Sequence, residues 1–326
     1  MRKPEASIII ACHNEEQMLP YSIEAVGQQA ESVPNQELII VVNGSTDASA
    51  EIARNSEIDM PVHVIETATP GKKHAMNLGM AAARSDFIVF NDADSIMPRD
   101  AVFHAINALE TDKTRLVGAP RKPLRPSGEG FYEHDFASAF YLMNYARRTA
   151  RPDQKTVQGW FMALNKTRLA EELEFPQGAS PDDTWLSAFV GSRFGTEAIH
   201  YQTNLPGEYI SPTNEQDMLA QIARHSLCRR LVRHEHPNIS DYFNQVEEYY
   251  AQTMTDAEFN KRWREETLKL GVDFDSWIDE YNTFKSRIGN VADAMFDTLV
   301  NMNGTWERIE SSKSLEHDTK EMKYAS

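Results

Sequence analysis

The chain has 326 residues, of which 41% are hydrophobic, so it is long enough for one large domain with an appendage or for two ordinary domains. Its 49 acidic residues outnumber 33 lysines and arginines, which gives a formal net charge of −16. An acidic excess of this size argues against a nucleic-acid-binding protein, because phosphate contacts require a basic face. A nucleotide ligand remains compatible, since a divalent cation can bridge acidic side chains to phosphate.

The cysteine content and the lack of long apolar runs indicate the cellular setting. Cys12 and Cys228 are too few for a disulfide framework or a set of zinc ligands, which favours a reducing compartment. No apolar run approaches the roughly 18 residues that span a bilayer. The N-terminus also lacks the apolar core of a secretory signal. We therefore expect a soluble cytoplasmic protein, with peripheral contact at the inner face of the membrane left open.

The first part of the chain alternates between short apolar runs and helical patterns. Residues 6–12 and 37–42 are continuous apolar runs, typical of strands buried on both faces of a parallel sheet. A third strand is expected at 61–65, an Ala-rich helix over 74–83 and a fourth strand at 87–90. This alternation predicts βαβ units in a doubly wound, mostly parallel α/β sheet.

The strand at 87–90 ends in the acidic turn NDAD (91–94), which places two carboxylates at positions i and i+2. Open α/β sheets bind their ligands at the carboxyl ends of the strands, where this turn would lie. Two hard oxygen donors on a short turn suit Mg²⁺ or Mn²⁺, with substrate phosphates completing the coordination shell. The alternative is that Asp92 and Asp94 only cap the helix that begins near Pro98.

The remaining elements are more mixed, and the chain then becomes almost wholly helical. We expect a helix from 98 to about 110, a strand at 115–118, a loop at 120–130, a helix over 131–149, a strand at 157–164, a short helix at 167–173, a loop at 176–183, a strand at 196–201 and a helix over 216–233. Pro237 marks the predicted end of a catalytic domain over residues 1–236. Residues 237–326 are predicted to form a helical extension with a frayed polar tail. This extension fits a helical cap, an oligomer surface or a partner-binding module equally well.

Polar side chains follow the predicted strands in an ordered set, and here the chain resembles a family 2 glycosyltransferase of the GT-A fold. The segments that carry the resemblance are IIIACHNEE (8–16), LIIVVNGSTD (38–47), GKKHAMNLGMAAARSDFIVFNDAD (71–94), GWFMALNKTRL (159–169), PDDTWL (181–186) and QIARH (221–225). They cover about residues 6–236 in the order of the family. The resemblance implies a GT-A domain followed by a C-terminal all-helical extension.

The resemblance also implies a binding site for a nucleotide-diphosphate sugar. The loop from His13 to Glu15 would flank the nucleotide base, and Lys72 would approach the base or the diphosphate. Asp92 would contact the ribose and the metal, and Asp94 would bind the metal, Mn²⁺ or Mg²⁺. The plainer alternatives are a first-turn helix acid for Glu15 and a solvated turn lysine for Lys72.

The end of the second strand departs from the pattern of the family. Many relatives have two acids there, one of which contacts uracil, whereas this chain has Val42 and Asn43. Asn43 can offer both a donor and an acceptor to a base or ribose. A UDP-linked sugar is still the expected donor, but the departure places the base contact in doubt.

A second pair of acidic residues is expected where the acceptor would bind. The resemblance assigns the role of catalytic base to the second acid of a Glu-Asp pair, which here is Asp182 followed by Asp183. Adjacent carboxylates disfavour double ionisation, which would raise the pKa of one of them. The same pair could also cap the helix that follows. Trp160 would offer an apolar stacking face to the acceptor sugar, with a core position as the alternative.

A third element contains Gln221, Arg224 and His225. It resembles the Gln-x-x-Arg-Trp element of the family, which contacts acceptor and diphosphate, with histidine in place of tryptophan. This replacement and the lack of transmembrane segments argue against processive polymerisation. His225 or His200 could alternatively reach the metal, although a structural role is the plainer interpretation.

Nine cations stand out locally against the acidic background. They are Arg121, Lys122, Arg125, Arg147, Arg148, Arg151, Arg229, Arg230 and Arg233. One hypothesis is that they receive a phosphorylated acceptor, such as a lipid diphosphate at a membrane surface. The alternative is that they are solvated helix faces.

Our interpretation is an inverting glycosyltransferase that moves a sugar from a nucleotide-diphosphate sugar to an acceptor hydroxyl, in cell-envelope polysaccharide or glycolipid biosynthesis. A non-catalytic GT-A scaffold is the main rival. A phosphohydrolase of the haloacid-dehalogenase type is a weaker one, because it needs its nucleophile on the first strand. A dinucleotide oxidoreductase is disfavoured, since residues 11–15 contain no glycine. The sequence predicts neither the sugar nor the acceptor, and it leaves oligomerisation through the C-terminal helices open.

Overall fold

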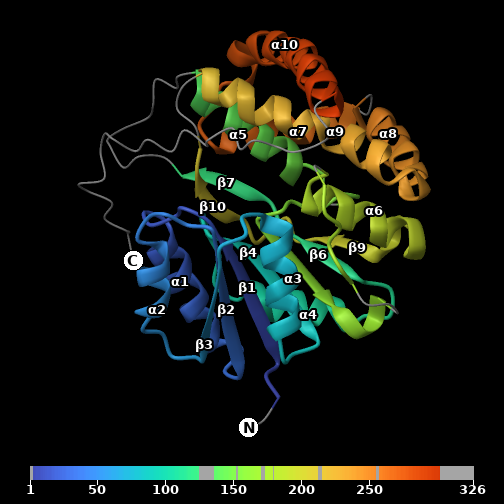
Figure 1. Ribbon diagram of the computed structural model, residues 1–326. Helices are drawn as coiled ribbons and strands as arrows, with labels where there is room; N and C mark the ends of the chain where they lie inside the picture. The colour runs from blue at the N-terminus through green and yellow to red at the C-terminus, as the bar shows by residue number, and fades with distance from the viewer. Residues whose placement is uncertain are drawn as a thin grey trace.

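The computed structural model describes residues 3–124, 136–151, 153–169, 173–178, 180–211, 215–254 and 257–301. A seven-stranded mixed sheet forms the centre of the larger part of the molecule (Figure 1), with strand order β3-β2-β1-β4-β8-β6-β9. Its strands are β1 (Ala6–Cys12), β2 (Gln36–Asn43), β3 (Val62–Thr67), β4 (Phe87–Asp92), β6 (Leu116–Gly118), β8 (Phe161–Asn165) and β9 (Ile199–Tyr201). β1 to β4 are mutually parallel, and β8 runs antiparallel to both β4 and β6. The predicted α/β class with a mostly parallel sheet is confirmed.

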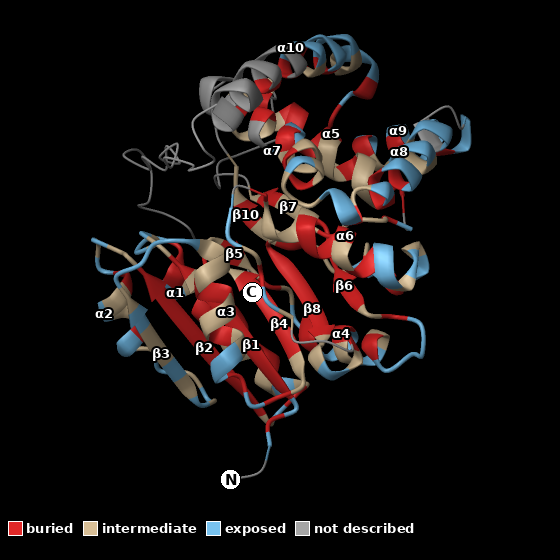
Figure 2. Cartoon of the chain, turned by 45° about the vertical axis from the view of Figure 1, so that its right-hand side comes forward, coloured by how far each residue is buried: buried red, intermediate tan, exposed pale blue. Residues whose placement is uncertain are grey.

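Helices cover both faces of this sheet and bury it (Figure 2). The helices are α1 (Leu19–Gly27), α2 (Ser49–Arg54), α3 (Lys72–Ala82), α4 (Ala101–Leu109) and α6 (Asp182–Phe194), with short 3₁₀ turns η1 (Gln28–Glu31), η2 (Lys166–Leu169), η3 (Thr196–Ala198) and η4 (Pro237–Ile239). One core cluster joins α1, α2 and α4 to the sheet, and the other joins α3, α6 and α8 (Asp241–Met254). β1 and β2 are apolar almost throughout because both of their faces are covered.

The contact between α3 and β1 is close enough to require a glycine. A Cβ atom at Gly79 would lie 2.4 Å from Cγ2 of Ile9, which is closer than two carbon atoms can approach. At the start of the same helix, Gly71 has φ of +137°, a backbone conformation that favours glycine. These two positions fix where α3 lies and where its first residue, Lys72, is presented.

A second, three-stranded sheet lies above the end of β4. It contains β5 (Ser95–Ile96), β10 (Gly207–Ile210) and β7 (Arg121–Leu124), in that order, with β10 parallel to β7 and antiparallel to β5. The loop expected over residues 120–130 is therefore wrong for residues 121–124, and residues 125–130 lie outside the described part. β7 can include Pro123 because it is an edge strand of this sheet.

The C-terminal helices pack on helices from the predicted catalytic domain. α5 (Phe136–Thr149), α7 (Glu215–Glu235), α9 (Ala257–Lys269) and α10 (Phe274–Asn301) form one helical layer, seen at the top of Figure 1. The rings of Phe140 and Tyr281 stack with centroids 4.9 Å apart, and Nε1 of Trp263 donates to the carbonyl of Met143 at 2.9 Å. The core of this layer thus combines residues from before and after residue 237. The division into domains 1–236 and 237–326 therefore remains a proposal. The frayed tail lies outside the described residues.

None of the helices in the described part combines the length and the apolar character that a bilayer crossing requires.

A buried hydrogen-bond network centred on Glu37 joins β2 to β1 and to the segment before β4. The side chain of Glu37 on β2 is fully buried and accepts from Oγ of Ser7 at 2.6 Å, from the backbone N–H of Arg84 at 2.9 Å and from its Nε at 2.6 Å. Burial alone would raise the pKa of Glu37. The hydrogen bonds from Ser7 and Arg84 outweigh burial and leave this pKa below its ordinary value.

We expect Glu37→Gln to lower the free energy of unfolding by about 1–3 kcal/mol at neutral pH, because it leaves buried donors without a charged acceptor. Since the pKa of Glu37 is lowered in the folded state, its contribution is present above the ordinary glutamate pKa of about 4.3 and is lost as the pH falls below it. Urea unfolding across this pH range measures the difference. Glu66→Gln, which removes a surface partner of Arg54, is the matched control and should cost less than about 1 kcal/mol. Equal losses in both variants would contradict the prediction.

Candidate functional site

The ammonium group of Lys72 lies at the centre of a charged cluster above the strand ends. Its Nζ is 2.7 Å from Oδ1 of Asp92, 3.0 Å from Oδ2 of Asp182 and 3.3 Å from the carbonyl oxygen of Gly159. Burial would lower the pKa of Lys72, but the two carboxylates raise it well above its ordinary value. Lys72 therefore stays charged and joins the end of β4, the start of α6 and the turn before β8. Its side chain keeps 37% of its surface accessible, but its ammonium group is ion-paired to two carboxylates.

Arg121 on β7 supplies a second cation to the acidic turn. Its Nη1 lies 3.4 Å from Oδ1 of Asp94, 3.9 Å from Oδ2 of Asp92 and 3.1 Å from Oγ of Ser95. The guanidinium lies 3.9 Å from the centre of the Tyr209 ring, which positions it by a cation–π contact. The contact of Arg121 with the acidic turn could not be predicted from local sequence, because β7 is placed there by its pairing with β10.

The acidic turn does not cap a helix. α4 begins at Ala101, and its N-cap residue is Asp100, so the alternative interpretation of Asp92 and Asp94 is wrong. Both carboxylates are instead about one quarter exposed, with 23% and 25% of their side-chain surface accessible. Burial, opposed by Lys72 and reinforced by Asp94, raises the pKa of Asp92 above its ordinary value.

Asp183 is held in a fixed orientation at the start of α6. Its Oδ2 accepts from the backbone N–H of Gly159 at 3.0 Å, and its Oδ1 accepts from the N–H and the hydroxyl of Thr184 at 2.6 and 3.0 Å. The pKa of Asp183 is raised, first by burial and then by the neighbouring charge of Asp182, while Lys72 opposes the shift. The predicted direction is confirmed, although burial is a larger cause than the paired carboxylate.

The base contact predicted for Asn43 needs correction. Its side chain is 2% exposed, its Nδ2 donates to the carbonyl of Cys12 at 2.8 Å, and its Oδ1 accepts from the N–H of Gly71 at 2.9 Å. Both ends of the amide are thus used to join β1, β2 and the turn before α3. His13 and Glu15 follow β1 at the same edge: Nδ1 of His13 lies 2.5 Å from the carbonyl oxygen of Asn43, and the N–H of Glu15 donates to Ser49. Their contacts with a base remain predictions.

The stacking role predicted for Trp160 also needs correction. The indole is 2% exposed, its Nε1 donates to the carbonyl of Ala119 at 2.7 Å, and the ring lies against Phe161. A Cβ atom at Gly207 would lie 2.3 Å from this ring, so the indole fills the space below β10. Trp160 contributes to the site only through its carbonyl oxygen, which accepts from the N–H of Asp92 at 2.9 Å.

The third element lies on α7 in the helical layer. Oε1 of Gln221 accepts from the hydroxyl of Tyr141 at 2.6 Å, and Tyr141 lies within electrostatic range of Arg121. Gln221 is thereby linked to the site indirectly. The side chain of Arg224 lies outside the described part, and its contact with acceptor or diphosphate remains a prediction. His200 lies on β9, three strands away from β4, so it is poorly placed to reach the acidic turn.

The charges of the site are compatible with a divalent cation. Four carboxylates, those of Asp92, Asp94, Asp182 and Asp183, lie around two cations, so two negative charges are uncompensated when all four are ionised. In the described part of the chain no three Asp, Glu, His or Cys side chains gather as a ligand set. The acidic turn therefore offers two hard oxygen donors, and substrate phosphate and water would have to complete the coordination.

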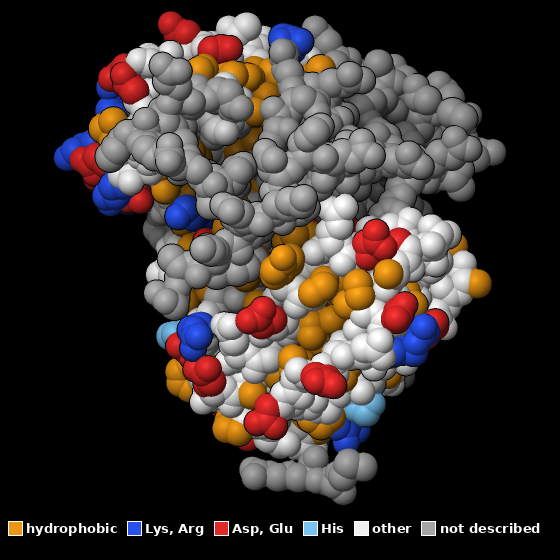
Figure 3. Space-filling model, turned by 90° about the vertical axis from the view of Figure 1, so that its left-hand side faces the viewer, with side chains coloured by type: hydrophobic (Ala, Val, Ile, Leu, Met, Phe, Trp, Pro, Cys, Tyr) orange, Lys and Arg blue, Asp and Glu red, His pale blue; other side chains and the backbone are white. Residues whose placement is uncertain are grey.

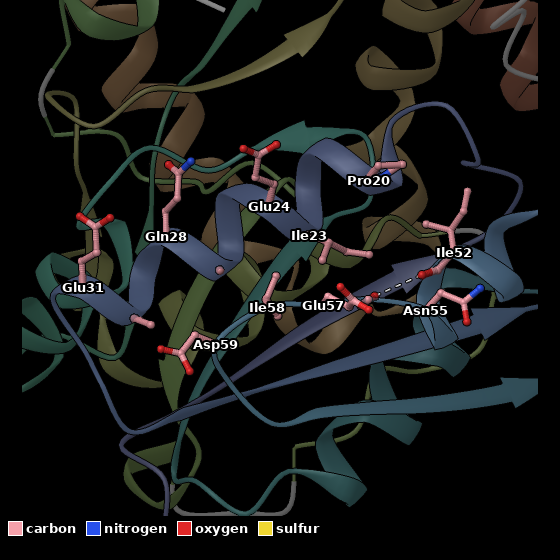
Figure 4. A pocket seen from close by; sticks show the side chains of 13 residues that line it. Pro20, Ile23, Glu24, Gln28, Glu31, Ile52, Asn55, Glu57, Ile58 and Asp59 are labelled. Atoms are coloured by element: carbon pink, nitrogen blue, oxygen red, sulfur yellow. Dashed lines mark hydrogen bonds between the residues drawn. The ribbon is translucent and has the colours of Figure 1, made fainter. Parts of the chain in front are cut away.

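A groove of about 630 Å³ lies elsewhere, between α1 and the segment that joins α2 to β3 (Figure 4). Ile23, Gly27 and Ile58 line it, and Glu24 and Glu57 project beside it. Figure 3 shows acidic side chains spread among apolar ones on the face of the molecule that looks to the left in Figure 1. No lysine or arginine lines the groove, so it does not suit a diphosphate.

This mixed sheet, with a carboxylate–lysine cluster at the ends of its strands, agrees with the GT-A fold that the sequence analysis expected. A sequence profile described as glycosyl transferase family 2 matches residues 7–173, about half of the chain. The chain belongs to glycosyl transferase family 2.

Similar proteins match only in part. The chain is 25% identical over 194 residues to glycosyltransferase GlyA of Streptococcus pneumoniae, covering 56% of this chain and 27% of that protein. It is 29% identical over 118 residues to poly-beta-1,6-N-acetyl-D-glucosamine synthase of Staphylococcus epidermidis, covering 35% of this chain and 28% of that protein. These matches span under a third of the length of either relative.

A solved structure is similar over most of the chain. The mannosyltransferase PcManGT from Pyrobaculum calidifontis, in complex with GDP-Man and Mn²⁺, is 16% identical with a TM-score of 0.56, covering 93% of this chain and 81% of that one. This likeness supports the fold, including the presence of the C-terminal helices.

Gly159 was missed by the sequence analysis as a residue of the site, although its segment was recognised. A Cβ atom there would lie 3.2 Å from both Oδ2 of Asp182 and Nζ of Lys72, and 3.5 Å from Cβ of Asp183.

We expect Gly159→Ala to displace these side chains by a few tenths of an ångström. The rate of nucleoside-diphosphate release from a nucleotide sugar should fall by about tenfold or more, because small misplacements are costly in catalysis. The thermal midpoint of the same variant serves as the control and should change little. Full activity would contradict this account.

Proposed function

We propose that the protein transfers a sugar from a nucleotide-diphosphate sugar to an acceptor hydroxyl, with inversion at the anomeric carbon. The observation that carries this proposal is the orientation of Asp183. Its carboxylate is held by Gly159 and Thr184 beside the pair formed by Lys72 and Asp182. A fixed carboxylate with a raised pKa, at the carboxyl ends of the strands, is suited to accept a proton from an acceptor hydroxyl.

The positive groups favour a diphosphate at the acidic turn. Lys72 and Arg121 would face the negative charge that develops as the bond between the sugar and the diphosphate breaks. Asp92 would contact the ribose, as the family resemblance implies. A divalent cation, Mn²⁺ or Mg²⁺, held by Asp94 and Asp92 would stabilise the leaving diphosphate as a Lewis acid when bound.

In the proposed reaction the acceptor oxygen attacks the anomeric carbon on the side opposite the diphosphate. Its proton passes to Asp183, the new glycosidic bond forms, and the bond to the diphosphate breaks in a single displacement. The hydrogen bonds from Gly159 and Thr184 would keep the carboxylate in line with the attacking hydroxyl.

UDP is the proposed nucleotide, and His13 and Glu15 at the end of β1 are the proposed contacts with its base. Because the amide of Asn43 is fully used within the protein, it is not proposed to contact the base. A thermal-shift comparison of UDP-linked and GDP-linked sugars with Mn²⁺ tests this choice. Stabilisation by the GDP-linked series alone would overturn it.

We expect Asp183→Asn to bind the donor with little change but to lose turnover by about 10²–10⁴-fold, because the amide cannot accept the proton. Asp94→Asn is the matched comparison at the other side of the site, and it should lose the metal-dependent part of donor binding. Donor-induced thermal shifts and nucleoside-diphosphate release measure the two effects separately. Undiminished turnover by Asp183→Asn would remove the assignment of the base, and indifference of the wild type to every nucleotide sugar would favour a scaffold.

The pH profile tests the environment of the same residue. A catalytic base acts when deprotonated, so its raised pKa should place the acidic limb of kcat/KM above the ordinary aspartate range. Asp182→Asn removes a charge that raises this pKa, and we expect the limb to move to lower pH. A limb that moves upward, or does not move, would show that another group controls it.

A further inference from the structure

The structure separates the nine cations that the sequence analysis grouped together. Arg121 lies at the acidic turn, and Arg229 and Arg233 on α7 lie 3.8 and 2.9 Å from Glu247. By contrast, Arg147 and Arg148 at the end of α5 form no ion pair within the described ranges of the chain. Among the residues that the structure describes, the positive charges of these two arginines are therefore not neutralised by a carboxylate, whereas Arg229 and Arg233 are paired with Glu247.

Lys285 on α10 adds a third positive charge to this pair. The hydroxyl of Tyr281, one helical turn before it, donates to Oδ1 of Asn144 at 2.9 Å, which ties α10 to the turn of α5 that precedes the arginines. All three cations are half-buried, and Lys285 Nζ lies 6.0 Å from the centre of the Tyr281 ring. Burial and then the charges of Arg147 and Arg148 lower the pKa of Lys285 to about 7. The two arginines add to the effect of burial, because nearby like charges disfavour the charged form of the lysine.

Some of the donors in this region have no partner. Nε of Arg147 is buried without a hydrogen bond in the described structure, as are Nε and Nη2 of Arg151, which lies just beyond the end of α5. Arg151 is only 5% exposed, and its guanidinium lies between the rings of Tyr250 and Phe259, at 4.6 and 4.5 Å. Buried donors and clustered like charges are costly unless an anion or water satisfies them. An anion bound beside Arg147 would offset both costs.

The cluster borders the proposed catalytic site. Arg148 lies beside the hydroxyl of Tyr201, which donates to Oε1 of Gln158 at 2.8 Å. Gln158 precedes Gly159, whose N–H holds Asp183. The charge of Arg148 also acts on Tyr209, the ring that positions Arg121. Arg148 thus approaches the site from the helical layer through Tyr201 and Gln158, while Lys72 and Arg121 lie at the acidic turn, the proposed place of the donor diphosphate.

We propose that Arg147, Arg148 and Lys285 form an anion subsite that binds a phosphoryl group of the acceptor. This inference rests on the proposed transfer reaction, and it names the acceptor as a phosphorylated molecule. A phosphate monoester carries a charge of about −1.5 to −2 at neutral pH and three strong acceptor oxygens, which match two guanidinium groups and one ammonium group. The sugar would then be added to a hydroxyl of the molecule that bears this phosphate.

Inorganic phosphate is the first probe, used with the full chain and with the donor site saturated by nucleoside diphosphate. Wild type should show a saturable rise in its thermal midpoint with phosphate. Arg147→Gln and Lys285→Gln should each weaken the phosphate dependence by about tenfold or more, the loss expected for one charge-assisted hydrogen bond. Arg287→Gln, an exposed cation on the same helix, is the matched control and should respond as wild type does.

A second readout separates ligand binding from a structural role. Because the cluster lacks a carboxylate, Lys285→Gln should not lower the thermal midpoint in the absence of phosphate. The proposal is overturned if wild type shows no saturable response, if both variants respond as wild type does, or if Lys285→Gln loses stability while still binding phosphate. If phosphate binding behaves as expected but no nucleotide sugar is turned over with any acceptor, the subsite stands and the proposed transfer reaction fails.

The source of the phosphoryl group is distinguished by two further probes. One is a soluble hexose 1-phosphate, and the other is phosphatidylcholine vesicles that contain a polyprenyl phosphate. Competition with inorganic phosphate by the soluble ester assigns a soluble acceptor. Co-sedimentation with the vesicles that is lost in the Arg147→Gln, Lys285→Gln double variant assigns a lipid-linked one. If the soluble ester does not compete with phosphate and the vesicles show no co-sedimentation that depends on Arg147 and Lys285, the assignment to the acceptor is overturned.

Discussion

The ion pairs of Lys72 are the interaction on which the rest of the site depends. Its ammonium group lies between Asp92 at the end of β4 and Asp182 at the start of α6, at 2.7 and 3.0 Å. Without a cation between them these carboxylates would repel each other in a site that is largely shielded from water. The close packing of α3 on β1 at Gly79, together with the conformation of Gly71, brings Lys72 to this place.

The second cation of the site comes from a different layer, and it connects the sheet to the C-terminal half. Arg121 leaves β7 to reach Asp94, and the ring of Tyr209 on β10 supports it. The helical layer above these strands includes α5 from the first part of the chain and α9 and α10 from the last part. The C-terminal helices thus support α5, whose arginines belong to the proposed anion subsite.

The main strands could be predicted from the sequence because each is a local pattern. β1, β2 and β4 are covered on both faces, so burial requires apolar residues throughout, and the run itself identifies the strand. β7 could not be identified in this way. Its residues 121–124 contain a proline and two cations, and they become a strand only by pairing with residues 207–210. Strand formation there depends on a partner distant in the sequence.

By itself the sequence determined the class of the fold, the place of the acidic turn after β4 and the identity of the second acidic pair. Only the tertiary structure decided which polar side chains still have atoms available to bind a ligand. Asn43 is used up by backbone groups of Cys12 and Gly71, and Trp160 is buried below β10. A residue type states what a side chain can bind, whereas its packing against distant segments decides whether any atom is left to bind a ligand. For this reason the positions of the strand ends could be predicted from the sequence, whereas the ion-pair partners of Lys72 and Arg121 could not.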